Sequence, residues 1–145
     1  MTEQARQRSM TKRQVSIRIE SVSGGDRIVQ KASGVLYPKG DHVYLRYAET
    51  EGELGETQTT IRLDGKEIRI VRSGDIRSEQ RFSVGTPFRG YYATPQGRLE
   101  LEIVTKSLRT ELPVSGSGEL KAVWSYELLV GGDLAGMYRL KLEAR

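Results

Sequence analysis

The feature that most constrains how this chain folds is an alternation of apolar and polar residues with a period of two. Val15, Ile17 and Ile19 alternate with polar residues, and several later segments follow the same rule. Such alternation is typical of β-strands that bury one face and expose the other. The further segments with this period lie at 43–47, 61–63, 68–70, 99–103 and 120–128. No stretch has the apolar spacing of an amphipathic helix, so the sequence predicts an all-β protein.

The segments between these strands contain glycine, aspartate and proline. Asparagine is absent from the sequence, so these residue types must form the turns. The turn clusters lie at 23–26, 38–41, 63–66, 72–75, 95–97, 115–118 and 131–133. The pair Asp64 and Gly65 predicts a hairpin with a type I′ turn, in which both central residues have positive φ. About ten antiparallel strands with tight connections indicate a meander that closes into a barrel or folds into a sandwich.

Length and charge predict one β domain preceded by a short leader. The chain has 145 residues and no cysteine, which excludes disulfides and thiolate metal sites. Residues 1–13 are predicted to be a disordered basic leader and residues 14–145 the β domain. The leader holds a side-chain charge of +3 out of the total of +4, so the domain is nearly neutral and nucleic acid is a disfavoured partner. No apolar run indicates a signal or a membrane anchor, which predicts a cytoplasmic protein without a membrane partner.

Four segments carry a resemblance to a known family. They are GVLYPKGDHVYLRYAE, IVRSGDIRSEQRF, GRLELEIVTKSL and SYELLVGG, in this order, within a similarity from about residue 14 to the C-terminus. The chain resembles the YwiB-like family of bacterial proteins of unknown function, which itself resembles the calycins, small barrels that include the lipocalins. The resemblance implies a single antiparallel meander barrel of 8–10 strands and no particular activity.

Two departures qualify this resemblance. Leu129 falls on the outward side of its strand, where the family more often carries a polar residue. Trp124 has no glycine two positions earlier, so the Gly-x-Trp signature of true lipocalins is missing. Extracellular ligand transport of the lipocalin type is therefore not implied.

The densest polar segment, residues 70–82, divides between the two faces of the predicted sheet. Because Ile68 and Ile70 point inward, the period places Arg72 inside at the end of that strand. In the next strand the same rule places Gln80 inside with Ser78. The outward side chains are Arg77, Glu79 and Arg81. These three are predicted to form solvated charge pairs, whereas the inward polar residues are candidates for a site.

An inward arginine requires a partner. None of the strands phased here places a carboxylate inside, so Arg72 either extends to water at the barrel rim or meets an anionic group of a ligand. Continuing the period along the later strands adds three inward polar residues. The predicted ligand-binding residues are Arg72, Gln80, Thr105, Ser107 and Tyr126. The alternative for the four uncharged members is hydrogen bonding among themselves or to buried water.

Catalytic and metal-binding residues are few. His42 is the only histidine and has no acidic partner at a useful spacing, so it is interpreted as a surface residue. The SGSG sequence at 115–118 lacks the ending of a phosphate-binding loop and is interpreted as a flexible hairpin. The sequence therefore predicts no catalytic residue, no metal and no cofactor.

Three functional classes follow, in decreasing order of support. The first is a module that binds a small anionic or amphipathic molecule in the barrel interior. The second is a protein–protein interaction or homodimeric module with a filled barrel, suggested by an exposed Leu129 and by the adjacent Tyr91 and Tyr92. The third is an enzyme that acts on an anionic substrate through Arg72.

Overall fold

The computed structural model describes residues 12–49, 55–113 and 118–145. In these residues ten strands form a closed antiparallel barrel, in which each strand pairs with the next along the chain and β1 pairs with β10. The strands are β1 (Arg13–Ser23), β2 (Asp26–Lys39), β3 (His42–Glu49), β4 (Thr57–Leu63), β5 (Ile68–Gly74), β6 (Arg77–Phe82), β7 (Phe88–Thr94), β8 (Gly97–Glu111), β9 (Leu120–Val130) and β10 (Asp133–Ala144). The all-β class and the meander barrel are confirmed.

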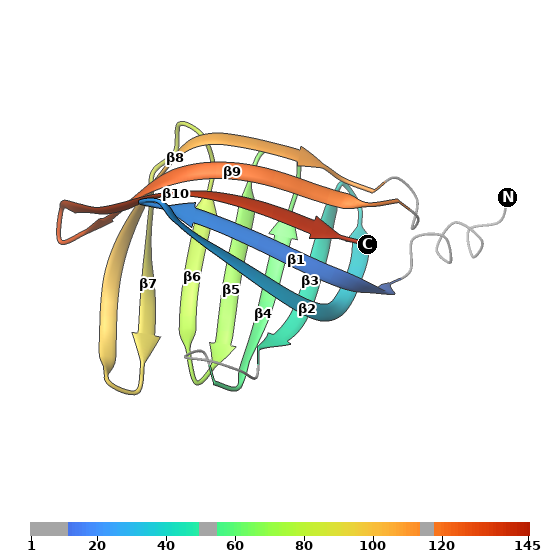
Figure 1. The fold of residues 1–145 in the computed structure, drawn as a ribbon, viewed down its shortest axis with the longest axis horizontal. Coiled ribbons are helices and arrows are strands. Elements are labelled where there is room, and N and C mark those ends of the chain that lie inside the picture. The colour runs from blue at the N-terminus through green and yellow to red at the C-terminus, as the bar shows by residue number, and fades with distance from the viewer. Residues whose placement is uncertain (1–11, 50–54, 114–117) are drawn as a thin grey trace, which may run out of the picture.

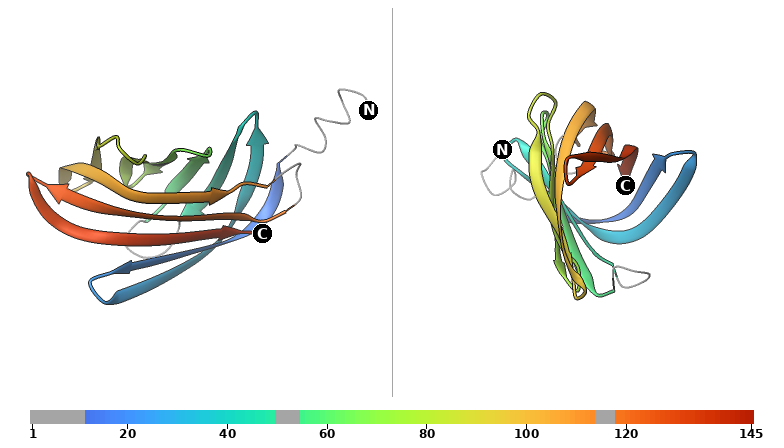
Figure 2. Two further views of the ribbon diagram at one scale, coloured as in Figure 1. Left: turned by 90° about the horizontal axis from the view of Figure 1, so that it is seen from above. Right: turned by 90° about the vertical axis from the view of Figure 1, so that its left-hand side faces the viewer.

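The barrel is flattened into two layers that cross at a large angle. Strands β3 to β7 run side by side, and β1, β9 and β10 cross them (Figure 1). The two longest strands, β2 with 14 residues and β8 with 15, bend and continue from one layer to the other (Figure 2). Two curved strands therefore close the sheet.

Alternating side chains from all sides fill the interior. Leu36, Leu45, Leu63 and Phe82 have no exposed surface, and Leu63 ends β4 next to the turn at one end of the barrel. Thr110 on β8 reaches across this end and donates a hydrogen bond to the carbonyl of Asp64 at 3.3 Å. The other end carries the inward polar side chains described below.

The turn at 64–67 joins β4 to β5 as predicted, but its geometry differs from the prediction. Leu63 pairs with Ile68, which leaves a loop of four residues, and Gly65 is not among the glycines with positive φ. Instead the Asp64 carboxylate accepts the backbone N–H groups of Lys66 at 2.8 Å and Glu67 at 2.7 Å. Side-chain capping thus replaces the type I′ turn that the Asp-Gly pair predicted.

Positive φ at two consecutive residues occurs in the Gly-Gly hairpins. Gly24 and Gly25 have φ of 57° and 86°, and Gly131 and Gly132 have φ of 60° and 86°. These are the values that a two-residue type I′ loop requires at both positions.

Strand β8 departs from strict alternation at Lys106. The register with β9 shifts between Thr105 and Ser107, so Ser107 pairs with Ser125 on the outer face. The prediction that Ser107 points inward is therefore wrong, because one extra residue in a strand reverses every side chain that follows it. At the other end of β8, Leu99 is 47 % exposed because residues 97–101 have no partner on β9.

Two predicted segments lie largely outside the described residues. These are the leader, of which Lys12 and Arg13 are described, and the hairpin at 115–118, of which Gly118 is described. Arg13 already belongs to β1. In the described part of the chain there is no helix with the length and apolar character needed to cross a membrane.

Candidate functional site at one end of the barrel interior

A buried carboxylate lies at the end of β3. Val43, Leu45 and Tyr47 point inward on this strand, and the same period places Glu49 inside, where its side chain is 2 % exposed. Its carboxylate accepts a hydrogen bond from Gln30 Nε2 at 2.7 Å and another from Thr59 Oγ1 at 2.6 Å. A buried carboxylate of this kind is tolerated because its oxygens are hydrogen-bonded and a cation lies beside it.

That cation is Arg72, whose Nε lies 3.5 Å from Glu49 Oε2 and whose side chain is 19 % exposed. The prediction that no carboxylate faces Arg72 is therefore wrong. Among the described residues, no hydrogen bond or ion pair other than this contact reaches the Arg72 guanidinium. The terminal nitrogens thus keep their donor capacity. We refer to Gln30, Tyr47, Glu49, Thr59 and Arg72 as the inner polar cluster.

Two buried tyrosines adjoin this pair of charges. Burial, followed by the negative charge of Glu49, raises the pKa of Tyr47 to about 12, although Arg72 acts in the opposite direction. The Tyr47 hydroxyl lies beside Thr59 without a hydrogen bond of good geometry. Burial also raises the pKa of Tyr126, with a smaller contribution from Tyr138 and an opposing one from Arg72. Both phenols are therefore neutral at physiological pH and able to donate.

Aromatic rings fill the barrel interior behind the inner polar cluster. The ring of Tyr126 lies 4.7 Å from that of Phe82 and 5.3 Å from that of Tyr138, and Phe82 lies 5.7 Å from Trp124. Such contacts are within the normal range for packed aromatic pairs. Aromatic rings, including that of Tyr126 close to Arg72, therefore pack on this side of the interior.

The structure brings together part of the predicted set. Tyr126 lies close enough to Arg72 for the positive charge to oppose the rise in the tyrosine pKa. Gln80 is half-buried on the neighbouring strand and pairs with Ile70, which places it on the inner face. Thr105 is buried and accepts the backbone N–H of Ser83 at 3.1 Å, a contact that ties the β6–β7 connection to β8. Ser107 contacts Ser125 on the outer face at 2.5 Å and is not part of this group.

The outward residues of β6 behave as predicted. Glu79 Oε2 accepts Arg69 Nε at 2.9 Å and Arg81 Nε at 3.2 Å on the outer face. Arg77 is exposed at the start of the strand. The polar segment at 70–82 therefore does divide into an inner and an outer part.

His42 has an acidic neighbour, contrary to the prediction. Its Nδ1 lies 3.1 Å from Asp41 Oδ1, and its ring meets the edge of Tyr44 at 5.3 Å. The hydrogen bond with His42 lowers the pKa of the exposed Asp41 carboxyl. Within the ranges described, no three metal-ligating side chains are grouped together.

The surface residues proposed for protein contact are less exposed than predicted. Leu129 does point outward, opposite Glu102, but it is half-buried. Tyr91 and Tyr92 are also half-buried, and the guanidinium of Arg98 lies 4.3 Å from the ring centre of Tyr91.

The family of the chain is shown by a match of residues 13–142 to the model of DUF1934, a domain of unknown function. The chain belongs to the DUF1934 family. One relative in this family is the uncharacterized beta-barrel protein YwiB of Bacillus subtilis (strain 168), which is 27% identical over 132 residues, covering 88% of this chain and 90% of the relative.

The crystal structure of the ywiB protein from Bacillus subtilis has the same fold as this DUF1934 chain. The TM-score is 0.80 at 26% sequence identity, over 99% of this chain and 98% of the other. The resemblance seen in the sequence is therefore confirmed. The comparison supplies no ligand, substrate or reaction for the DUF1934 barrel.

Sequence reasoning missed Glu49, Gln30, Tyr47 and Thr59 as parts of the site. A signal for Glu49 was available, because continuing the period of Val43 and Leu45 by two further steps reaches it. The sequence gives a weaker signal for Gln30. The residues before it contain no run of alternating apolar residues that would show which face of the sheet Gln30 occupies.

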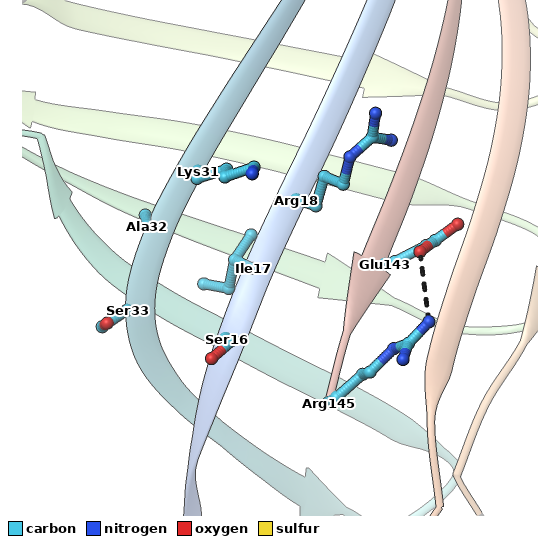
Figure 3. A pocket seen from close by; sticks show the side chains of 8 residues that line it. All are labelled: Ser16, Ile17, Arg18, Lys31, Ala32, Ser33, Glu143 and Arg145. Atoms are coloured by element: carbon cyan, nitrogen blue, oxygen red, sulfur yellow. Dashed lines mark ion pairs between the residues drawn. The ribbon is translucent and has the colours of Figure 1, made fainter.

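A groove of this DUF1934 protein lies on the outer face of the barrel, away from the inner polar cluster. It has a volume of about 480 Å³ and runs over β1, β2 and the end of β10 (Figure 3). Its polar lining residues are Ser16, Arg18, Lys31, Ser33, Glu143 and Arg145. We call this feature the outer groove.

Proposed function

We propose that this DUF1934 protein binds a small amphipathic anion at the end of the barrel interior that holds Arg72. The observation that carries this proposal is the Arg72 guanidinium, which is mostly buried yet uses only one edge on Glu49. A ligand carboxylate or phosphate can accept two parallel N–H bonds from the free edge of an arginine. Because Glu49 already balances one charge, a bound anion requires further donors, which the neutral Tyr47 and Tyr126 hydroxyls are suited to supply.

Apolar side chains that stay partly exposed on the inner face of the barrel support an apolar part in the ligand. Ile28 is 67 % exposed although its register with Ser21 assigns it to the inner face, two residues from Gln30. Leu128, Tyr138 and Leu140 on β9 and β10 are half-buried on the same face. Since rings fill the interior around Phe82, the ligand tail is expected to lie against these residues at the barrel end.

Isothermal titration with three twelve-carbon probes tests the proposal. Dodecanoate, dodecanol and dodecyltrimethylammonium have the same tail and differ in head-group charge. The two ionic probes are used below their micelle concentrations, and dodecanol is used below its solubility limit. We expect the protein to prefer dodecanoate. Arg72→Gln should weaken dodecanoate binding by roughly 10-fold or more, because a hydrogen bond to a charged group contributes about 1.5–3 kcal/mol.

Arg69→Gln is the matched control, because Arg69 lies on the same strand with its side chain on the outer face. It should leave dodecanoate binding unchanged. Equal affinity for all three probes, or equal losses in the two variants, would contradict a site at Arg72.

A further inference from the structure

We infer that the outer groove is a binding site for a phosphate-bearing small molecule. It is separate from the proposed ligand site, because its polar side chains lie on the outer face of the barrel. In Figure 3 Lys31 extends from β2 toward β1, and Arg18 and Arg145 rise from β1 and the end of β10. The volume of about 480 Å³ falls in the range of roughly 300–1,000 Å³ found for small-molecule sites, and it leaves room for an organic part beside the phosphate.

The groove places two like charges against each other. Arg18 and Lys31 are direct partners in the antiparallel register of β1 and β2. Lys31 has no ion pair among the described residues. Like charges directly opposite in a sheet are destabilising, so an anion bound between them would remove a repulsion as well as form new contacts.

Small hydroxyl side chains form the floor of the groove beside these cations, two residues along the same strands. Ser16 and Ser33 are also register partners, and both are exposed. In the part of the chain that is described, neither hydroxyl makes a hydrogen bond, although the backbone of Ser16 exchanges two bonds with Arg145 at 2.9 and 3.0 Å. A phosphate above this floor could accept bonds from both hydroxyls and both flanking cations.

The carboxylates near the groove are already held by cations. Glu143, the one side-chain carboxylate in the lining, lies 3.3 Å from Lys141 Nζ and 3.9 Å from Arg145 Nη2. Glu20 contacts Arg18 at 3.1 Å but also Arg27 at 2.9 Å, so its charge is shared. Glu119 holds Arg145 Nε at 2.8 Å. Lys31 is therefore the lining cation whose charge a bound anion would neutralise most directly.

Titration with inorganic phosphate and with pyrophosphate, at constant ionic strength in chloride, tests this inference. Backbone amide resonances are followed by nuclear magnetic resonance. We expect saturable shifts at Ser16, Arg18, Lys31 and Ser33, with tighter binding of pyrophosphate. Lys31→Ala and Arg18→Gln should each weaken pyrophosphate binding at least fivefold.

Two control variants separate this site from general attraction and from the proposed function. Lys39→Ala removes an exposed lysine at the end of the same strand and should leave binding unchanged. Arg72→Gln should also leave it unchanged, so that failure of the inner site and failure of the outer groove are distinguishable. The inference is overturned if neither probe binds saturably, or if Lys39→Ala weakens binding as much as Lys31→Ala.

Discussion

Strand β5 carries one arginine–glutamate contact on each face of the sheet. The two contacts differ in burial as well as in distance. On the outer face, Arg69 lies 2.9 Å from Glu79, and the side chains are 40% and 23% exposed. On the inner face, Arg72 lies 3.5 Å from Glu49, with side chains 19% and 2% exposed. Water screens the shorter contact, whereas the longer one lies in a medium of lower effective dielectric constant. Burial therefore outweighs distance in deciding which pair matters for stability.

The two glutamates also differ in what else holds them. Glu79 is shared by Arg69 and Arg81, both of which have solvent as an alternative partner. Glu49 is held by Gln30 and Thr59 from two other strands, so the inner polar cluster links β2, β3, β4 and β5. Removing one member of the inner cluster leaves polar groups unpaired inside the barrel, and this is the basis of the predictions that follow.

Glu49→Ala should have the largest effect. It removes the counter-charge of Arg72 and leaves Gln30 and Thr59 without their acceptor. Breaking a buried pair from one side costs about 3–5 kcal/mol, and partial exposure of Arg72 reduces the expected loss of unfolding free energy to about 3 kcal/mol. Urea denaturation at pH 7 measures it.

A double variant sharpens this prediction. Glu49→Leu combined with Arg72→Met removes both charges and should recover most of the lost unfolding free energy, because a buried pair replaced by apolar residues is often neutral for stability. A double variant as unstable as Glu49→Ala would show that the hydrogen bonds of Glu49, and not the unpaired charge of Arg72, account for the loss.

The second prediction concerns alkaline pH. Tyr47 has a pKa of about 12 in the folded protein against about 10 for an unperturbed tyrosine. The unfolded chain therefore releases this proton first, and stability that is fully present below pH 10 is lost as pH rises toward 12, by roughly 2 kcal/mol. The buried Tyr126 acts in the same direction. Unfolding free energy measured between pH 9 and pH 12 should fall less steeply in Tyr47→Phe.

Tyr37→Phe is the matched variant for this measurement, because Tyr37 lies on the outer face of β2 and stacks on Tyr44. It controls for the removal of a tyrosine hydroxyl as such. If Tyr47→Phe shows the same slope as Tyr37→Phe, the phenol of Tyr47 does not titrate in the predicted range.

The fold could be predicted from the sequence because period-two alternation is a local property. The polar neighbours of an apolar residue show that it points inward, as they do for Ile61, Leu63, Ile68 and Ile70. The turn clusters show where the strands begin and end. The same rule placed Arg72 and Tyr126 correctly on the inner face. It also applied to Glu49, but this residue lies two positions beyond Tyr47, the last inward apolar residue of its strand, and no further apolar residue on that face shows that the strand continues.

What the sequence could not show depends on long-range register. The bulge at Lys106 adds one residue to β8 and moves Ser107 to the outer face, and no residue type in this segment marks it. The contact between Arg72 and Glu49 joins residues on β5 and β3, which are not neighbours in the sheet. Strict alternation predicts the face of a residue but not its partner across the barrel.

Glu79→Ala should have the smallest effect and completes the comparison of the two faces. Exposed ion pairs contribute about 0–1 kcal/mol, so we expect this variant to lose less than about 1 kcal/mol of unfolding free energy although it removes two contacts. Repeating the urea denaturation in 1 M NaCl distinguishes the faces further, because salt screens the Glu79 contacts and should abolish the small loss, whereas the loss in Glu49→Ala should persist. A loss in Glu79→Ala as large as that in Glu49→Ala would show that the outer pairs, and not the inner polar cluster, stabilise this part of the barrel.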